Sequence, residues 1–110
     1  MRNIVVVTKE DVTLEMLKGY VIIQSGYWND EPTLNQGVIE EGNKAIYLAV
    51  DNNFDLDYEP NELVELSKKI GFQPKSIIDI HISNSEKSEE LAEKIAEDII
   101  GKWGGIVDRE

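Results

Sequence analysis

The segment "SIIDIHIS" constrains the fold most, because its side chains alternate in character along the chain. Successive residues of a β-strand point to opposite faces of a sheet. Ile78, Ile80 and Ile82 therefore share one face, whereas Ile77, Asp79 and His81 share the other. A strand with this pattern needs an apolar layer on one side only. The segment predicts an antiparallel sheet that is covered on one face.

Further strands are predicted from apolar and β-branched runs. "RNIVVVT" (2–8) has the pattern of a buried strand, and "YVIIQSGYW" (20–28) is predicted to form a second one. "QGVIEEGNKAIYLAVD" (36–51) has a hairpin pattern, in which the turn formers of "EGNK" separate two strands. For "GGIVD" (104–108), a last short edge strand and an irregular ending are both left as alternatives.

Three helices are predicted from apolar spacing and end signals. A short helix near the N-terminus is expected to stop at Gly19, and a second begins at Pro60 and ends before Gly71. The longest helix carries apolar residues at every fourth position as far as Trp103, which is expected to be a core residue.

The order β-α-β-β-β-α-β-α is typical of the α+β class. We predict a single domain over residues 1–110, with a mainly antiparallel sheet of about five strands. Two longer helices are expected to pack on one face, with one short helix near the N-terminus. A chain of 110 residues can bury roughly two thirds of the surface that it exposes when unfolded, which is enough for one core.

Acidic residues dominate the charge of the chain. The sequence has 22 acids against 11 bases, a net charge of −11, and residues 29–65 hold ten of the acids and a single base, Lys44. A field of this sign repels phosphate groups, so nucleic acids and anionic membranes are excluded as expected partners, whereas basic proteins are attracted. The alternative is that the acidic surface serves solubility alone.

The N-terminal sequence and the absence of Cys indicate a compartment. The apolar run "IVVV" is too short for a signal peptide or a membrane span. With no Cys there is no disulfide framework and no thiolate metal site, which fits a reducing compartment. A cytoplasmic location is predicted.

The loop "SGYWNDEPTLNQG" places Tyr27 and Trp28 beside two acids. Tyr and Trp are enriched among the residues that dominate binding energy at interfaces. Because consecutive strand residues face opposite sides, one of the two is expected to turn inward and leave the other exposed. The predicted partner-binding residues are Tyr27, Trp28, Asp30, Glu31, Glu40, Glu41, Asp51, Asp55, Asp57 and Glu59.

Catalytic and metal chemistry have little support in the sequence. Asp79 and His81 are i, i+2 neighbours about 6–7 Å apart, too far for an assured hydrogen bond, so a solvated or surface-paired histidine is expected. The run "DNNFDLDYEPNE" (51–62) has oxygen-bearing side chains at most ligand positions of an EF-hand calcium loop. However, Leu56 stands where that loop requires Gly, which favours an acidic connection from strand to helix. We predict no catalytic residue, cofactor or metal.

Three segments carry a resemblance to a class of proteins: the "YWNDEP" loop, the hairpin "VIEEGNKAIYLAVD" and the ending "SEELAEKIAEDIIGKWGGIVD". Together with the size, the acidity and the α+β pattern, they resemble the small acidic immunity proteins of bacterial toxin systems. Such proteins bind and neutralise a cognate toxin, which is often a basic nuclease. The resemblance is one of class and covers the whole chain loosely. It implies a 1:1 complex with a basic protein toxin.

Two other functions stay open. One is a non-catalytic adaptor or homo-oligomeric accessory protein with an apolar interface, and the other is a small-molecule or metal-dependent enzyme. Self-association would distinguish the first, and a tightly bound ligand or ion the second.

Overall fold

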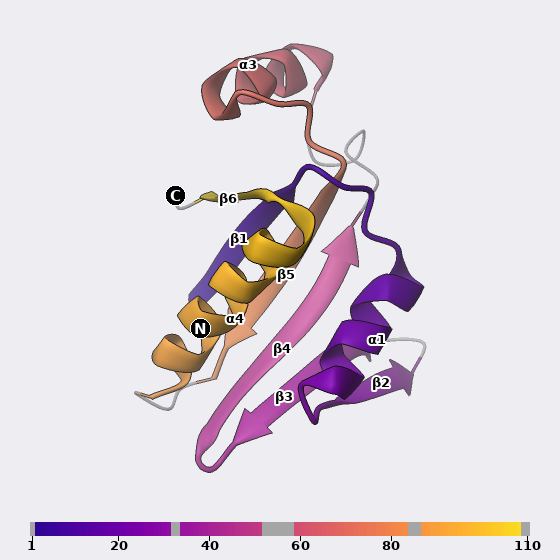
Figure 1. Ribbon diagram of the computed structural model, residues 1–110, viewed down its shortest axis with the longest axis vertical. Helices are drawn as coiled ribbons and strands as arrows, with labels where there is room; N and C mark the ends of the chain where they lie inside the picture. The colour runs from indigo at the N-terminus through magenta and orange to yellow at the C-terminus, as the bar shows by residue number, and fades with distance from the viewer. Residues whose placement is uncertain (1, 32–33, 52–58, 84–86, 109–110) are drawn as a thin grey trace.

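The structure is a computed structural model that describes residues 2–31, 34–51, 59–83 and 87–108 (Figure 1). Among these residues, three consecutive strands follow the first helix, and single strands and helices alternate after them. In chain order the elements are β1 (Arg2–Thr8), α1 (Leu14–Ile23), β2 (Tyr27–Glu31), β3 (Leu34–Glu41), β4 (Lys44–Asp51), α3 (Pro60–Ile70), β5 (Ser76–Ile82), α4 (Ser88–Trp103) and β6 (Gly105–Asp108).

The six strands form one sheet in the order β2-β3-β4-β5-β1-β6, and every neighbouring pair is antiparallel. The N-terminal strand β1 lies between β5 and β6, with Ile4 opposite Ile80 and Val6 opposite Val107. The α+β class and the antiparallel sheet are therefore confirmed. The sheet has one strand more than the five predicted, because the segment that was left open does form the edge strand β6.

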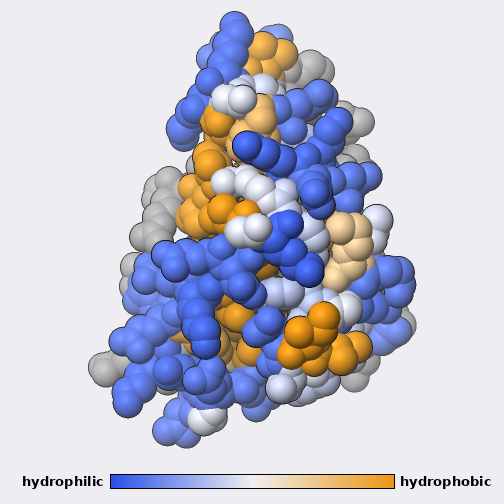
Figure 2. All heavy atoms as spheres, viewed as in Figure 1, coloured by the Kyte–Doolittle hydropathy of each residue, from blue (hydrophilic) through white to orange (hydrophobic). Residues whose placement is uncertain are grey.

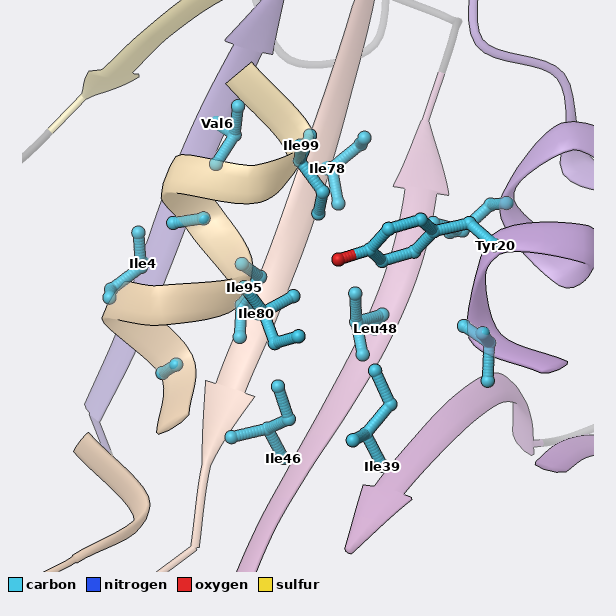
Figure 3. Packing of buried hydrophobic residues seen from close by; sticks show 14 of the residues in the cluster. Ile4, Val6, Tyr20, Ile39, Ile46, Leu48, Ile78, Ile80, Ile95 and Ile99 are labelled. Atoms are coloured by element: carbon cyan, nitrogen blue, oxygen red, sulfur yellow. The ribbon is translucent and has the colours of Figure 1, made fainter. Parts of the chain in front are cut away.

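The core lies on one face of the sheet, as the alternation in β5 predicts. Ile78, Ile80 and Ile82 are buried there beside Ile46 and Leu48 of β4. Figure 3 shows these side chains between the sheet and two helices, with α4 on one side and α1 on the other. The buried stripe of α4 consists of Leu91, Ala92, Ile95, Ala96, Ile99 and Trp103, which confirms the predicted place of the tryptophan.

Helix α1 continues through Gly19, so the predicted strand over 20–28 is wrong in its first part. Leu17, Tyr20 and Val21 are all buried, and their i, i+3 and i+4 spacing places them on one helical face. An apolar run of this length fits a buried helix as well as a strand. Gly19 is exposed and is tolerated within the helix.

The chain turns sharply between α1 and β2. Ser25 has a positive φ of 65°, and the Gly26 N–H donates to the Val21 carbonyl at 2.9 Å. A Cβ on Gly26 would lie 2.3 Å from the carbonyl oxygen of Val38, so only glycine fits this close approach to β3. Strand β2 therefore begins at Tyr27.

Helix α3 has the predicted ends but not the predicted place. It begins at Pro60 and ends before Gly71, which adopts the left-handed conformation with φ 83°. It lies beyond the end of the sheet (Figure 1), and no described residue of α3 belongs to the main core cluster. The prediction that the two longer helices cover the sheet is therefore wrong: α4 shares that face with α1. The reason is that α1 supplies Leu17, Tyr20 and Val21 to the main core cluster, whereas Leu66, which is buried in α3, lies outside that cluster.

Tyr20 connects α1 to α4. Its Oη donates a hydrogen bond to Asp98 Oδ2 at 2.7 Å, and its ring meets Trp103 edge to face, with centroids 5.6 Å apart. Burial and the hydrogen bond to Asp98 raise the pKa of the Tyr20 phenol above its usual value. Because the helices do not follow one another in the chain, this contact fixes the distance between them.

We expect Leu48→Ala to lower the free energy of unfolding by about 2–5 kcal/mol, because Leu48 is fully buried at the centre of the core. The matched control is Ile23→Ala, at a side chain that is 74% exposed, which should change stability by less than about 0.5 kcal/mol. Urea unfolding measures both. Similar losses in the two variants would contradict the described position of the core.

Tyr20→Phe should cost about 1 kcal/mol, because it removes a partly buried hydrogen bond to a carboxylate. The same bond is removed by Asp98→Ala, so the loss in the double variant should be smaller than the sum of the single losses. Additive losses, measured by urea unfolding, would mean that residues 20–23 do not form the helix that places Tyr20 against α4.

Candidate functional site

The face of the sheet opposite α1 and α4 is the candidate site. The alternation that buries one set of side chains leaves the other set on this second face. One row crosses five strands, with Tyr27 opposite Val38, Val38 opposite Tyr47, Tyr47 opposite His81 and His81 opposite Asn3. We call this surface the open sheet face; its residues are Asn3, Val5, Tyr27, Val38, Glu40, Tyr47, Ala49, Asp51, Asp79 and His81. Val38 is buried within it, and so are Val7 and Ile77, a pair that continues this face next to Val5 and Asp79.

Trp28 turns away from the open sheet face and packs against the core. It lies opposite Gly37, where an added Cβ would stand 2.9 Å from the tryptophan ring, so the ring covers the glycine. Its Nε1 donates to Asn35 Oδ1, and Lys18 Nζ lies 5.8 Å from the ring centroid. Trp28 thus fills the space that a glycine leaves in the sheet.

Tyr27 is the exposed member of the aromatic pair, with 55% of its surface accessible. The prediction that one aromatic turns inward and the other stays exposed is confirmed. The Tyr27 Oη donates to Glu40 Oε1 at 3.0 Å, which raises the pKa of the Tyr27 phenol. Two predicted partner-binding residues are therefore joined on the open sheet face.

Asp79 lies at the centre of the open sheet face, between Ala49 of β4 and Val5 of β1. Its half-buried carboxyl group has a raised pKa, mainly because burial removes water from it. The nearby His81 acts in the opposite direction, and Asp51 raises the pKa further. Asp79, His81 and Asp51 therefore act on one another through space on this face.

The other predicted acids do not all share this surface. Asp51 ends β4 on the open sheet face, whereas Asp30 is on the helix-covered side, with its Oδ2 3.8 Å from Lys18 Nζ. Glu41 is exposed at the β3–β4 turn, one strand position after Glu40 and therefore on the opposite face.

Three acids near the remaining loops complete the predicted set. Glu59 is exposed at the start of α3, where its backbone N–H donates to Glu62 Oε1 at 3.3 Å. Glu31 belongs to β2, but its side chain is not described. Asp55 and Asp57 lie outside the described residues, as does most of the EF-hand-like run. The structure thus places Tyr27, Glu40 and Asp51 on one face and Trp28, Asp30 and Glu41 on the other. Tyr27 and Glu40 are joined by a hydrogen bond, whereas Asp51 lies six residues along β4 from Ala45, the partner of Glu40.

Sequence reasoning did not include Tyr47, Asp79 and His81 among the partner-binding residues. The signal was present in "SIIDIHIS", because its alternation already placed Asp79 and His81 on the side away from the core. Both residues were considered only as candidates for acid–base or metal chemistry. Tyr47 needed the β4–β5 register, which places it directly opposite His81.

Other chemistry is not indicated in the described part of the chain. Among these residues, no group of three or more His, Cys, Asp or Glu is placed to hold a metal ion. No described helix has the length and apolar character needed to cross a membrane. A groove of about 450 Å³ beside α4 is lined by side chains of both charge signs, namely Gln24, Lys94, Ile95, Glu97 and Asp98.

Comparisons of the chain with protein-family models, with curated proteins and with solved structures find no match.

Asp79→Asn should stabilise the fold at pH 7. The pKa of Asp79 is higher in the folded protein than in the unfolded chain, where it is near 3.8. The protonated group is therefore tolerated in the fold at low pH, and stability is lost as the pH rises through the folded pKa and the group becomes charged. The asparagine side chain of the variant carries no charge at any pH. The gain in the free energy of unfolding over the unchanged chain should therefore be present at pH 7 and absent at pH 3. Urea unfolding at both pH values measures it.

Glu97→Gln on the exposed side of α4 is the control for this gain, since it removes one negative charge from the same chain. We expect it to change stability by less than about 0.5 kcal/mol at pH 7. A loss of stability in Asp79→Asn at pH 7 would contradict the described environment of the carboxyl group.

Proposed function

We propose that this protein is a non-catalytic, stoichiometric inhibitor of a basic protein, of the kind found as immunity proteins in bacterial toxin systems. The open sheet face is the surface that binds the partner, in a 1:1 complex. A cytoplasmic location, and a nuclease as the toxin, stay predictions that accompany this proposal.

The observation that best supports the proposal is that all the charged Asp, Glu, Lys and Arg side chains that define the open sheet face are acidic. Glu40, Asp51 and Asp79 are its acids, and no Lys or Arg is among the residues that define it. The outer surface of α4 is different, because Lys94 and Lys102 are interspersed there among acids. A surface whose charges are all of one sign suits a basic partner better than the mixed surface of α4 does.

An acidic surface and aromatic side chains have complementary effects on binding, and here Tyr27 is exposed and Tyr47 is partly exposed. The carboxylates raise the rate of encounter with a basic protein and orient it, an effect that salt screens. Tyr27 and Tyr47 offer broad rings that bury apolar area while each retains a polar group. Tyr27 is already held by Glu40, so less side-chain freedom is lost on binding.

A second function, self-association, is favoured by a different surface. Ile22 and Ile23 are adjacent at the end of α1 and are 63% and 74% exposed. Figure 2 shows a hydrophobic patch over this part of α1, among the hydrophilic side chains of the helix-covered face. Two exposed isoleucines form a small patch, so the acidic open sheet face supports the first proposal better. Light scattering at several concentrations separates the two, because only self-association gives a larger species with the protein alone.

The test uses charge reversal on the two sides of the molecule. Glu40→Lys combined with Asp51→Lys changes the open sheet face, and Glu90→Lys combined with Glu97→Lys makes the same change of net charge on α4. Each protein is immobilised and exposed to a low-salt lysate of the source cells, and the retained partner is purified for kinetics. Circular dichroism confirms that each variant is folded.

We expect a basic partner in a 1:1 ratio whose activity falls on binding. The association rate should drop about tenfold or more for the sheet-face variant at low salt, and much less at high salt, because charges steer the encounter. The α4 variant should associate within a few-fold of the unchanged chain. Equal rates for the two variants would contradict the proposed surface, and a partner that keeps full activity would contradict inhibition.

A further inference from the structure

Two short side chains flank Asp79 across the sheet. Its neighbours across the sheet are Ala49 on β4 and Val5 on β1, both with short side chains. Directly opposed side chains in an antiparallel sheet have Cβ atoms only about 4.5–5.5 Å apart. A long side chain that entered from outside the sheet would therefore meet short side chains on both neighbouring strands, whereas the buried Ile77 bounds the site along β5.

The Asp79 carboxylate has unused capacity to accept hydrogen bonds. Within the part of the chain that the structure describes, it has no hydrogen bond and no ion pair. It is nevertheless half-buried, and burial is the main cause of its raised pKa. The nearby His81 does not offset this burial, so a cation that donates hydrogen bonds would gain more here than at an exposed acid.

Tyr47 adds an aromatic ring at a fixed position near this carboxylate. It lies opposite His81, two residues from Asp79 along β5, so Tyr47 and Asp79 are diagonal neighbours on adjacent strands. Diagonal neighbours are about 7–8 Å apart, within reach of a single extended cation. Arginine suits this pair, because its planar guanidinium donates two parallel hydrogen bonds to a carboxylate and stacks on aromatic rings. The lysine ammonium is smaller and more strongly hydrated.

We infer that the centre of the open sheet face receives an arginine side chain of a protein partner, with the guanidinium bound by Asp79 and stacked on Tyr47. This inference rests on the proposed function and names the group on the basic partner that the face recognises. Asp51 and Glu40 then act as surrounding charges that orient the partner. Asp79 is the central contact.

The experiment uses capped tetra-arginine and tetra-lysine peptides as probes, titrated at low salt into isotope-labelled protein and followed by NMR. Tetra-arginine should shift the side-chain carboxyl signal of Asp79 and the backbone amide signals of Tyr47 and His81. It should bind several-fold more tightly than tetra-lysine. Asp79→Asn should weaken tetra-arginine binding about tenfold, whereas the charge-matched Glu97→Gln on α4 should weaken it less than twofold.

Tyr47→Leu is the second variant, since it keeps the carboxylate and removes the ring. It should abolish the preference for arginine over lysine while leaving tetra-lysine binding within about twofold. Because Asp79→Asn is expected to be at least as stable as the unchanged chain, weaker binding by that variant is not explained by unfolding. Unfolding curves recorded on the same samples verify this.

Three results would overturn the inference: equal weakening by Asp79→Asn and Glu97→Gln, equal affinity for the two peptides, or shifts centred on α4. Failure here is distinct from failure of the proposed function. If a basic partner binds in a salt-dependent manner but is insensitive to Asp79→Asn, the arginine inference alone is wrong. If tetra-arginine binding depends on Asp79 but no basic partner is inhibited, the inference about the surface holds and the proposed function is wrong.

Discussion

The packing of the main core against a single face of the sheet is the constraint on which the rest of the structure depends. In β4 and β5, alternate residues form two layers, and only the layer that contains Leu48 and Ile80 is covered by α1 and α4. A one-residue slip in the register would turn these side chains outward and bring Asp79 into the core. The arrangement that builds the core therefore also fixes Tyr47, Asp79 and His81 on the opposite face.

The fold could be predicted from the sequence where the spacing of apolar residues matched either a strand or a helix but not both. The strict alternation in β5 and the turn "EGNK" indicated an antiparallel sheet with one covered face, and the regular spacing in α4 placed Trp103 in the core. Residues 20–23 could not be assigned in this way, because a short apolar run suits a buried strand or helix equally well. The position of α3 depends on tertiary packing, which its own apolar stripe does not encode.

The candidate site was predictable only in part, because a shared surface depends on register. The sequence places Tyr27 and Trp28 on opposite faces, but the glycine at position 37 decides that the tryptophan is the one that packs inward. Glu40 lies within hydrogen-bonding distance of Tyr27 only because β2 and β3 pair in this register. Acidity along the chain drew attention to residues 29–65, whereas the centre of the open sheet face includes Asp79, outside that window.

The central claim is that the molecule has one closed face and one open face, and that the partner binds to the open one. Hydroxyl-radical footprinting of the aromatic and histidine side chains, with and without the inhibited partner, tests both parts in one measurement. We predict strong labelling of Tyr27, Tyr47 and His81 in the free protein, weak labelling of Tyr20 and Trp103, and protection of Tyr47 and His81 when the partner is bound. Strong labelling of Tyr20 in the free protein, or unchanged labelling of Tyr47 and His81 in the complex, would contradict the account.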